Sequence, residues 1–553
     1  MSLLAQIRRS VIGEGMPIQT PFGPKPLVYA DYTASGRGLT FLEDFIQHRV
    51  LPGYANTHTE TSFTGRQSTA LREQARSQIR SAVNGTAQHK VIFTGSGATA
   101  AIDKLIGMLN LRLPPQLNGQ HGFDQQIPDS QRPVVFIGPY EHHSNELIWR
   151  ESIATLVPIA LDAQGQIDQQ QLSAELQRYA DRPLKIGSFS AASNVTGIKS
   201  DVRGISELLH AQGALAFWDY AAAAPYVAID LQDQGQDALF ISPHKFIGGP
   251  GTPGVLVVNE DILTNSVPAV PGGGTVVYVT PEDHRYSTDI ERREEGGTPA
   301  IVESIRAGLV FQLQQQVGTA QIEALEHGFI QRALVRWAEY PAIEVLGGTD
   351  AERLSICSFQ IHHQGRPLHY GFVVALLNDL FGIQARGGCS CAGPYGHYLL
   401  GLNMADSKAL EARLLAGDGV LRPGWTRMNF NYFIDEACFE YLVRAVELVA
   451  EYGWRLLPFY QYDPAVGVWR FQGQHSELPV ALSDCQPASV LAAEPEPVVD
   501  YAGLLQEAED ELCRSRLDET RYALGLSDES AALCWFVRPE QIELDDEGEP
   551  GRQ

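Results

Sequence analysis

The feature that most constrains the fold is an alternation of short apolar runs with helical segments between about Val28 and Val310. Apolar runs bounded by glycine, with helices between them, indicate crossover units and a mostly parallel sheet covered on both faces. The sequence therefore predicts an α/β fold with functional residues in loops at the carboxyl ends of the strands. The runs predicted as strands are "KVIFTG", "RPVVFIG", "LKIGSFS", "ALAFWDY", "ALFIS" and "GVLVV", and the helices after the first three are "ATAAIDKLIGML", "HSNELIWRES" and "VRGISELLHAQG".

The chain is long enough for more than one domain, and its pattern changes along its length. Long helices predicted between about Val302 and Tyr340 lead into a second unit. There, "LSICSFQIH" and "TRMNFNYF" predict strands, and "HYGFVVALLNDLFG" and "DEACFEYLVRAVELVAEYGWRLL" predict helices. We therefore predict an N-terminal segment (1–27), a large domain (28–310), a smaller α+β domain (311–458) and an acidic C-terminal extension with a linker (459–553).

Local composition gives predictions for the remaining segments. The stretch "LRLPPQLNGQHGFDQQIPDSQ" is predicted as a polar surface loop, and "LAAEPEPVVD" as a linker. Asp500 is a candidate cap for a helix through "YAGLLQEAEDELCRSRL". The run "ALCWFVRP" is predicted as a strand, and the final "ELDDEGEPGRQ" as disordered.

Composition excludes several classes of protein. No run of about 18 apolar residues occurs, which argues against a membrane span. The opening "MSLLAQIRRSVIGEG" lacks the features of a secretory signal, so a cytoplasmic location is expected. A formal charge of −25 disfavours nucleic acid or anionic lipid as the main partner. Seven cysteines, an odd and sparse number, argue against a disulfide framework.

A lysine stands at the end of a predicted buried strand in "ALFISPHKFIGGPGTPGVLVV". Lysine is among the residues least often buried without a partner, so the position of Lys245 needs a physical reason. Asp219 ends the preceding strand in "FWDYAAAAPY", where a lone carboxylate is costly unless a cation meets it. Lys245 and Asp219 are therefore expected to face one crevice. The alternative is that Asp219 only caps a helix through the alanines that follow.

A third element is the glycine turn in "VIFTGSGATAAIDKL". A strand, a tight turn and a helix start form an anion site, because free backbone N–H groups and the helix dipole favour phosphate. Gly95, Gly97 and Ala100 also match the dinucleotide fingerprint G-x-G-x-x-A, but a loop stands where that fingerprint requires an acidic residue. A purely structural turn is the other alternative. With Lys245 and Asp219, the turn fits pyridoxal phosphate, which needs an anion site, a carboxylate at its ring nitrogen and a lysine at its aldehyde.

The order of the motifs over roughly residues 28–455 resembles the class V pyridoxal-phosphate enzymes, and within them the cysteine desulfurases. The motifs that carry the resemblance are "GATAA", "YEHHSN", "ASNVTG" and "EEGGTPA". The resemblance implies the type I fold of pyridoxal-phosphate-dependent transferases. It implies Ala98, Thr99, Ser242 and His244 at the phosphate, His142 stacked on the ring, Asn194 at the phenolic oxygen, Asp219 at the ring nitrogen and Lys245 as the Schiff-base lysine. Thr298 would reach the phosphate of a neighbouring subunit, which implies a homodimer.

The segment "IQARGGCSCAGPYG" distinguishes between reactions. Desulfurases need a mobile cysteine whose thiolate attacks the substrate sulfur, and a thiolate forms more readily near cationic groups. By resemblance Cys391 is this nucleophile, with Cys389 two residues earlier and Arg386 before both. The alternatives are two packing cysteines in a glycine-rich turn or a metal pair. A C-x-C pair without further ligands nearby is a poor zinc site, so no metal site is predicted.

The same resemblance implies a set of substrate contacts. Arg427 in "GWTRMNFNYF" matches the arginine that binds the substrate carboxylate, a contact suited to a guanidinium fork, and Arg422 is close enough in sequence to compete for the role. Arg386 and Asn194 are further candidates. His58 in "YANTHTETS" lies on a loop that borders the active site in relatives.

The implied activity is conversion of a small amino acid, L-cysteine, to L-alanine. Lys245 would remove the Cα proton and Cys391 would attack the substrate sulfur, keeping it as a persulfide for a sulfur-acceptor protein. Ala222 departs from this pattern, because desulfurases usually carry glutamine there. The run "DYAAAAPYVAIDL" and the pattern Arg-x-Gly-Cys-x-Cys are similar to molybdenum-cofactor sulfurases.

Two alternatives to desulfuration stay open. The same scaffold hosts transamination, epimerisation and β-elimination, so the fold alone does not choose among them. The second alternative belongs to another class of protein: a non-catalytic scaffold whose acidic tail recruits partners.

Overall fold

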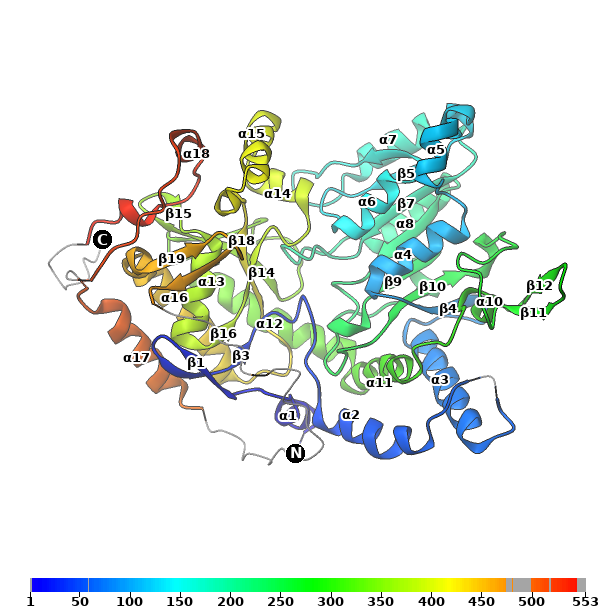
Figure 1. Cartoon of the computed structure of the whole chain (residues 1–553), viewed down its shortest axis with the longest axis horizontal. Coiled ribbons are helices and arrows are strands. Elements are labelled where there is room, and N and C mark those ends of the chain that lie inside the picture. The colour runs from blue at the N-terminus through cyan, green and yellow to red at the C-terminus, as the bar shows by residue number, and fades with distance from the viewer. Residues whose placement is uncertain (1, 58, 474–479, 481–498, 517–518, 545–553) are drawn as a thin grey trace.

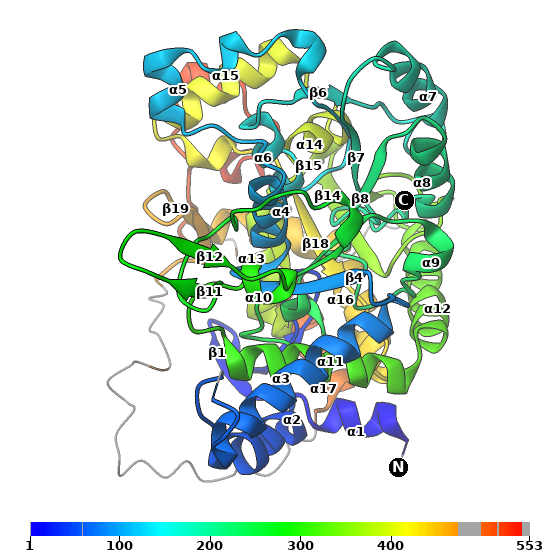
Figure 2. The ribbon, with the colours of Figure 1, turned by 90° about the vertical axis from the view of Figure 1, so that its right-hand side faces the viewer.

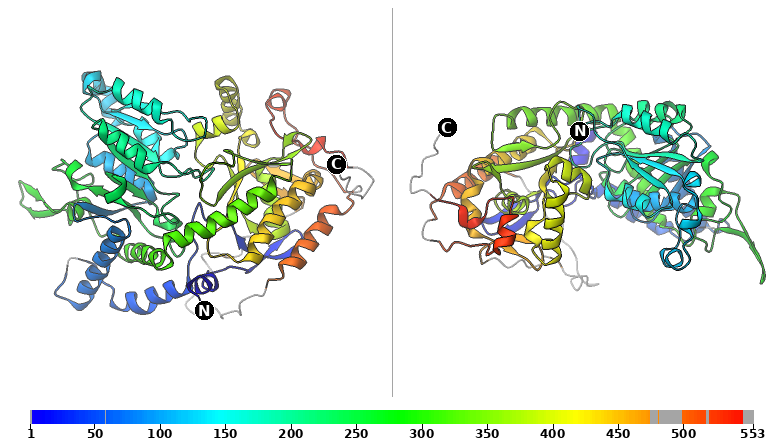
Figure 3. Two further views of the ribbon diagram at one scale, coloured as in Figure 1. Left: turned by 180° about the vertical axis from the view of Figure 1, so that it is seen from behind. Right: turned by 90° about the horizontal axis from the view of Figure 1, so that it is seen from above.

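The computed structural model describes the chain except for residues 1, 58, 474–479, 481–498, 517–518 and 545–553. A larger unit built on a seven-stranded sheet lies beside a smaller unit with an antiparallel sheet (Figure 1, Figure 3). The C-terminal segment packs on the side of the smaller unit that faces away from the larger one (Figure 1). Among the described residues, no helix combines the length and the hydrophobicity that crossing a membrane requires.

The larger unit is organised by its seven-stranded sheet. The strands are β4 (His89–Thr94), β5 (Val134–Ile137), β6 (Thr155–Pro158), β7 (Lys185–Ser190), β8 (Leu215–Asp219), β9 (Ala238–Ile241) and β10 (Gly254–Asn259). Their order is β4-β10-β9-β8-β7-β5-β6, and all except β10 run in the same direction. The predicted mostly parallel sheet is confirmed. Strand β6 was not predicted, because this partly exposed edge strand carries a weak apolar signal.

Helices cover both faces of this sheet, and this explains why its strands are apolar without alternation. The helices are α4 (Gly97–Met108), α6 (Leu147–Arg150), α7 (Gln169–Arg178), α8 (Val202–Ala211) and α9 (Leu231–Gln234). Figure 2 shows α7, α8 and α9 on one side of the sheet and α4 and α6 on the other. In β4, Val91 and Phe93 join the apolar cluster of one face, whereas Ile92 joins that of the other.

The smaller unit has its own sheet and its own apolar cluster. The sheet contains β13 (Ile343–Val345), β14 (Ile356–His363), β17 (Arg386–Gly388) and β18 (Trp425–Asn429), with β15 (Arg366–Pro367) paired to β14. Helices α12 (Thr319–Trp337), α13 (Tyr370–Phe381) and α16 (Glu436–Tyr452) contribute residues to the cluster. The predicted α+β character of this region agrees with these elements.

The N-terminal chain is anchored on the smaller unit before it enters the larger one. Strand β3 (Val28–Tyr29) pairs in parallel with β16 (Ile383–Gln384), and Val28 and Ala30 pack in the apolar cluster of the smaller unit. The segment directly after β3 is thereby held near strands β17 and β18, since Asn429 donates its N–H to the carbonyl of Ala30. The domain boundaries given above stay predictions.

The C-terminal segment agrees with the sequence in part. Asp500 caps α17 (Tyr501–Cys513) by accepting the N–H of Gly503 at 3.1 Å, as predicted. The strand predicted at "ALCWFVRP" is wrong, because α18 (Asp528–Ala532) ends there and the apolar residues after it pack on the smaller unit without joining a sheet. The linker residues 491–498 and the tail 545–553 lie outside the described residues. The predicted loop after α4 also carries a short helix, α5 (Pro115–His121).

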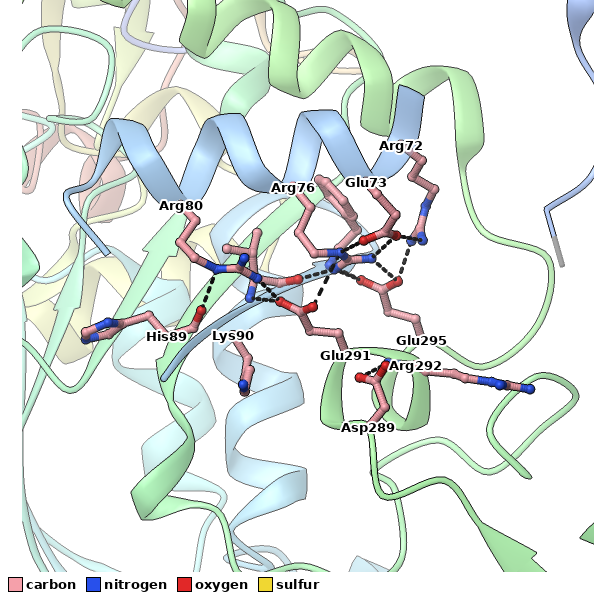
Figure 4. A network of polar contacts seen from close by, with 12 residues as sticks. Arg72, Glu73, Arg76, Arg80, His89, Lys90, Asp289, Glu291, Arg292 and Glu295 are labelled. Carbon is pink, nitrogen blue, oxygen red and sulfur yellow. Dashed lines mark hydrogen bonds and ion pairs between the residues drawn. The ribbon is translucent and has the colours of Figure 1, made fainter. Parts of the chain in front are cut away.

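A buried ionic network joins α3 (Phe63–Ala82) to the end of α10 (Ile290–Glu294) and to β4 (Figure 4). Arg76 Nη1 and Nη2 lie 3.0 Å from Glu295 Oε1 and Oε2, and Arg72 also bonds Glu295. Glu295 Oε1 accepts the N–H of Phe93 at 2.7 Å. Burial opposes ionisation of Glu295, but Arg76 and Arg72 outweigh it and lower the pKa of this carboxyl group. Each buried charge in the network is therefore stabilised by the opposite charges beside it.

We expect Glu295→Gln to lower the free energy of unfolding by about 3–5 kcal/mol, because it leaves two buried guanidinium groups without their shared anion. Since the folded-state pKa lies below its ordinary value, this stabilisation is present at neutral pH and is lost as the pH falls through that pKa. Urea unfolding followed by tryptophan fluorescence measures it. The control Glu175→Gln breaks a partly exposed pair with Arg178 and should cost less than about 1 kcal/mol. Equal losses in the two variants would contradict the prediction.

Candidate active site

The ends of three strands bring the candidate residues to one edge of the large sheet. Strand β4 leads into α4, β8 ends at Asp219, and β9 leads into the turn that carries Lys245. A cavity of about 250 Å³ lies at this edge. The predicted residues that line it are Ala98, Thr99, His142, Asn194, Asp219, Ser242, His244, Lys245, Arg386, Cys391 and Arg427.

Lys245 and Asp219 are both withdrawn from water and act on each other electrostatically. Burial lowers the pKa of Lys245 from 10.5 to about 8, with Asp219 opposing the shift. Burial raises the pKa of Asp219, with the N–H of Ala221 and the charge of Lys245 opposing that shift. The N–H of Ala221 donates to Asp219 Oδ1 at 2.8 Å. An ionised Asp219 therefore needs a cation at the cavity, and Lys245 has an amine that is partly neutral near physiological pH.

The N-terminus of α4 forms one end of the cavity. Ser96 precedes the helix without a side-chain cap, and Ala98 donates its N–H to Ser242 Oγ at 2.9 Å. Gly97 has a φ of +57°, and a Cβ there would lie 2.8 Å from Ser242 Oγ and 2.9 Å from the ring of His244. Only glycine fits this approach. Backbone N–H groups and a helix dipole thus face the cavity, an arrangement that favours an anion.

The segment after β5 supplies one wall. His142 lines the cavity, its Nδ1 accepts the N–H of Ser144 at 3.1 Å, and burial lowers its pKa to about 4. A neutral, flat ring at this place can stack on a bound ring. Glu141 is buried behind it and accepts hydrogen bonds from the N–H of Ser190 at 3.0 Å and from Asn145 Nδ2 at 2.8 Å. Burial raises the pKa of Glu141 to about 7. Glu141 belongs to the motif "YEHHSN", but no role was predicted for it from the sequence.

The smaller unit brings two arginines, which share one carboxylate. Arg427 on β18 and Arg386 on β17 bond the two oxygens of Asp31, at 3.1 Å from Nη2 and 2.8 Å from Nε. Arg427 Nη1 also donates to the carbonyl of Asn194 at 2.9 Å. Arg422 is exposed and does not line the cavity, whereas Arg427 does. Asp31 was missed, because it is separated from both partners by more than 350 residues.

Cys391 is the cysteine that faces the cavity. It is exposed, and it lines the cavity together with Arg427. Cys389 is half-buried against the apolar cluster of the larger unit and does not line the cavity. Asn194 Nδ2 donates to the carbonyl of Ser390 at 2.8 Å, which fixes the turn before Cys391.

Two predicted site residues stand apart from this group, and one lining position departs from the family pattern. Thr298 is exposed, bonds Asn56 at 3.4 Å and does not line the cavity. His58 lies outside the described residues. Ala222 lines the cavity with a methyl group, so this position offers no side-chain hydrogen bond to a bound molecule.

The site lies at the carboxyl edge of a mostly parallel sheet. It combines a buried lysine and carboxylate with a helix N-terminus that favours an anion and a flanking histidine. These features are typical of enzyme sites that hold a phosphorylated aldehyde cofactor. Arginines and a cysteine from a second unit complete its walls. The chain belongs to the aminotransferase class-V family, which residues 28–407 match.

Several proteins of similar sequence and several solved structures of similar fold are named as cysteine desulfurases. A probable cysteine desulfurase of Halalkalibacterium halodurans is 29% identical over 381 residues, covering 68% of this chain and 86% of the relative. A cysteine desulfurase of Synechococcus elongatus is 27% identical over 387 residues, covering 68% of this chain and 56% of the relative. The apo cysteine desulfurase of Thermococcus onnurineus NA1 has a similar fold, with a TM-score of 0.65 at 21% identity over 81% of this chain and 98% of that one.

The cysteine desulfurase CsdA of Escherichia coli also shares the fold, with a TM-score of 0.61 at 20% identity over 80% of this chain and 97% of that one. The α/β fold class predicted from the sequence is confirmed by these structures. The predicted resemblance to cysteine desulfurases is confirmed by the relatives.

We expect Lys245 of the cofactor-free, full-length chain to react with formaldehyde and borohydride with a midpoint near pH 8, because only the neutral amine attacks an aldehyde. Asp31 stabilises the ammonium form, so Asp31→Asn should move the midpoint to lower pH. Mass spectrometry of the Lys245 peptide measures the rate from pH 6 to 10. Asp233→Asn, at an exposed pair with Arg203, is the control and should leave the midpoint unchanged. A midpoint above pH 10 in the unsubstituted chain would contradict the burial of this amine.

Proposed function

We propose that the chain is a pyridoxal-phosphate-dependent cysteine desulfurase, which converts L-cysteine to L-alanine and keeps the sulfur as a persulfide on Cys391. The observation that carries the proposal is that Cys391 and Arg427 line the same cavity as Lys245 and Asp219. Cys391 and Arg427 suit a sulfur-containing amino acid, and Lys245 and Asp219 suit the cofactor. Relatives named as cysteine desulfurases support the same reaction.

The residues of the cavity fit pyridoxal phosphate. The α4 N-terminus would hold the phosphate with Ala98, Thr99, Ser242 and His244, and the glycine at 97 leaves room for close approach. Asp219 is buried and needs a cation, which a protonated ring nitrogen provides. Lys245 has a lowered pKa and would bond the aldehyde carbon. His142 would stack on the ring, and Asn194 would lie at its phenolic oxygen.

The chemistry supplied by pyridoxal phosphate, when bound, is electron withdrawal from the Cα of an amino acid. Arg427 would bind the substrate carboxylate, assisted by Arg386. Lys245 Nζ, released when the substrate amine takes its place, would take the Cα proton. The thiolate of Cys391 would form a sulfur–sulfur bond as the Cβ–sulfur bond of the substrate breaks, and the electron pair of the broken bond stays on carbon. Protonation of that carbon, and return of the proton from Lys245 to Cα, would complete alanine, and the sulfur would remain on Cys391 at the oxidation level of a persulfide.

Cys391→Ser tests the proposal. We expect alanine formation from L-cysteine to fall by roughly two orders of magnitude or more, because no nucleophile remains to take the sulfur. The deuterium exchange at Cα, which depends on Lys245, should persist. Cys389→Ser is the matched control and should keep most of the activity. Alanine is measured by chromatography and the persulfide by mass spectrometry of the Cys391 peptide.

A Cys391→Ser protein that consumes amino acids at the full rate would contradict desulfuration. If it then gives a keto acid or a racemised amino acid, the chain performs transamination, epimerisation or β-elimination on the same scaffold.

The assembly and partners belong to the same proposal. A homodimer, in which Thr298 reaches the phosphate of the partner subunit, is supported by the position of Thr298 outside its own cavity and by its exposure. A sulfur-acceptor protein and a cytoplasmic location also stay proposals. Sedimentation velocity of the full chain would give twice the mass of one chain for the dimer.

A further inference from the structure

The turn that carries Cys391 has an uncommon backbone conformation. Ser390 has a φ of +53° and Cys391 a φ of +55°, so two consecutive residues with side chains lie in the left-handed region. Such residues are unfavourable there unless neighbouring groups hold them, because Cβ crowds the following carbonyl oxygen. The placement of the Cys391 thiol thus depends on the bonds made by its neighbours.

His143 makes two hydrogen bonds to this turn, one at Cys391 and one two residues after it. Its N–H donates to the carbonyl of Cys391 at 2.8 Å, and its ring Nε2 accepts the N–H of Gly393 at 3.0 Å. The approach is close, since a Cβ at Gly393 would lie 3.1 Å from Nε2. The ring bond joins the start of α14 (Gly393–Leu399) to the loop after β5. His143 itself does not line the cavity.

We propose that His143 is a positioning residue, which holds the Cys391 turn in its strained form and so directs the thiol into the cavity. The inference rests on the desulfurase function proposed above. The family resemblance implies a role only for the first histidine of "YEHHSN". The geometry separates the two, because His142 forms a wall of the cavity and His143 bonds the turn that carries the nucleophile. The amide of Asn194 holds the other end of the turn, through the carbonyl of Ser390.

The chemical consequence is confined to sulfur transfer. Lys245 and Asp219 lie at the ends of strands of the large sheet, and in the described part of the chain neither is hydrogen-bonded to His143. Removing the ring acceptor should therefore leave Cα proton transfer intact. It should slow formation of the sulfur–sulfur bond, because the thiol then samples positions away from the substrate.

Two substitutions separate the acceptor from the ring. His143→Phe keeps a flat ring and loses the acceptor, whereas His143→Gln keeps an acceptor oxygen. His121, an exposed histidine at the end of α5, gives the matched control His121→Gln. All four proteins are prepared as full-length holoenzyme.

The first readout is steady-state conversion of L-cysteine to alanine, and the second is deuterium exchange at Cα of L-alanine. For His143→Phe we expect kcat to fall about 10-fold with KM changed less than about 2-fold, and the Cα exchange to stay within about 2-fold of the unsubstituted protein. His143→Gln should recover part of kcat, and His121→Gln should match the unsubstituted protein. An unchanged kcat in His143→Phe, or an equal fall in exchange and kcat, would overturn the inference.

A third readout does not depend on the desulfurase reaction. The rate at which iodoacetamide alkylates Cys391, followed on its peptide by mass spectrometry, should change at least about 3-fold in His143→Phe if the ring fixes the thiol. If the unsubstituted protein exchanges Cα protons and forms no alanine from cysteine, the proposed function fails, and this rate still decides the role of His143. An alkylation rate equal in all four proteins would refute positioning by the ring.

Discussion

The cavity depends on a pair of opposite charges that are both withdrawn from water. Asp219 is the last residue of β8, and Lys245 lies in the turn after β9. These two strands pair in parallel, with Asp219 opposite Phe240. Either ion alone would be costly at this depth, and each opposes the pKa shift that burial imposes on the other. The pair is possible because helices cover both faces of the sheet and because β8 and β9 end side by side at one edge of it. The apolar strands and the charged site are therefore parts of one arrangement.

A second set of charges ties the smaller unit to this edge. Asp31 follows a strand that is anchored beside β16, and it receives bonds from Arg386 on β17 and Arg427 on β18. Arg427 continues to the carbonyl of Asn194, which belongs to the larger unit. A shared carboxylate reduces the repulsion between two guanidinium groups and fixes their direction. The two arginines are thus held in fixed positions at the cavity.

The sequence predicted the parts of the site that lie next to strands, because strand ends carry a local pattern. Lys245, Asp219 and the glycine turn at 95–97 could be found from their positions after apolar runs. Asp31 and His143 could not be found in this way, since their roles depend on partners about 350 and 250 residues away. The error at "ALCWFVRP" has a related cause: an apolar run indicates burial, and burial against an existing core needs no strand partners.

The C-terminal extension stabilises the smaller unit from outside the cavity. Trp535 and Phe536 pack on the ring of His369, and Trp469 Nε1 donates to His369 Nδ1 at 2.9 Å. Burial lowers the pKa of His369 to about 3, so this ring is neutral at physiological pH and accepts the tryptophan N–H. None of the described residues of the extension lines the cavity. The described part of the extension therefore packs on the unit whose strands β17 and β18 carry the two arginines, and not on the cavity itself.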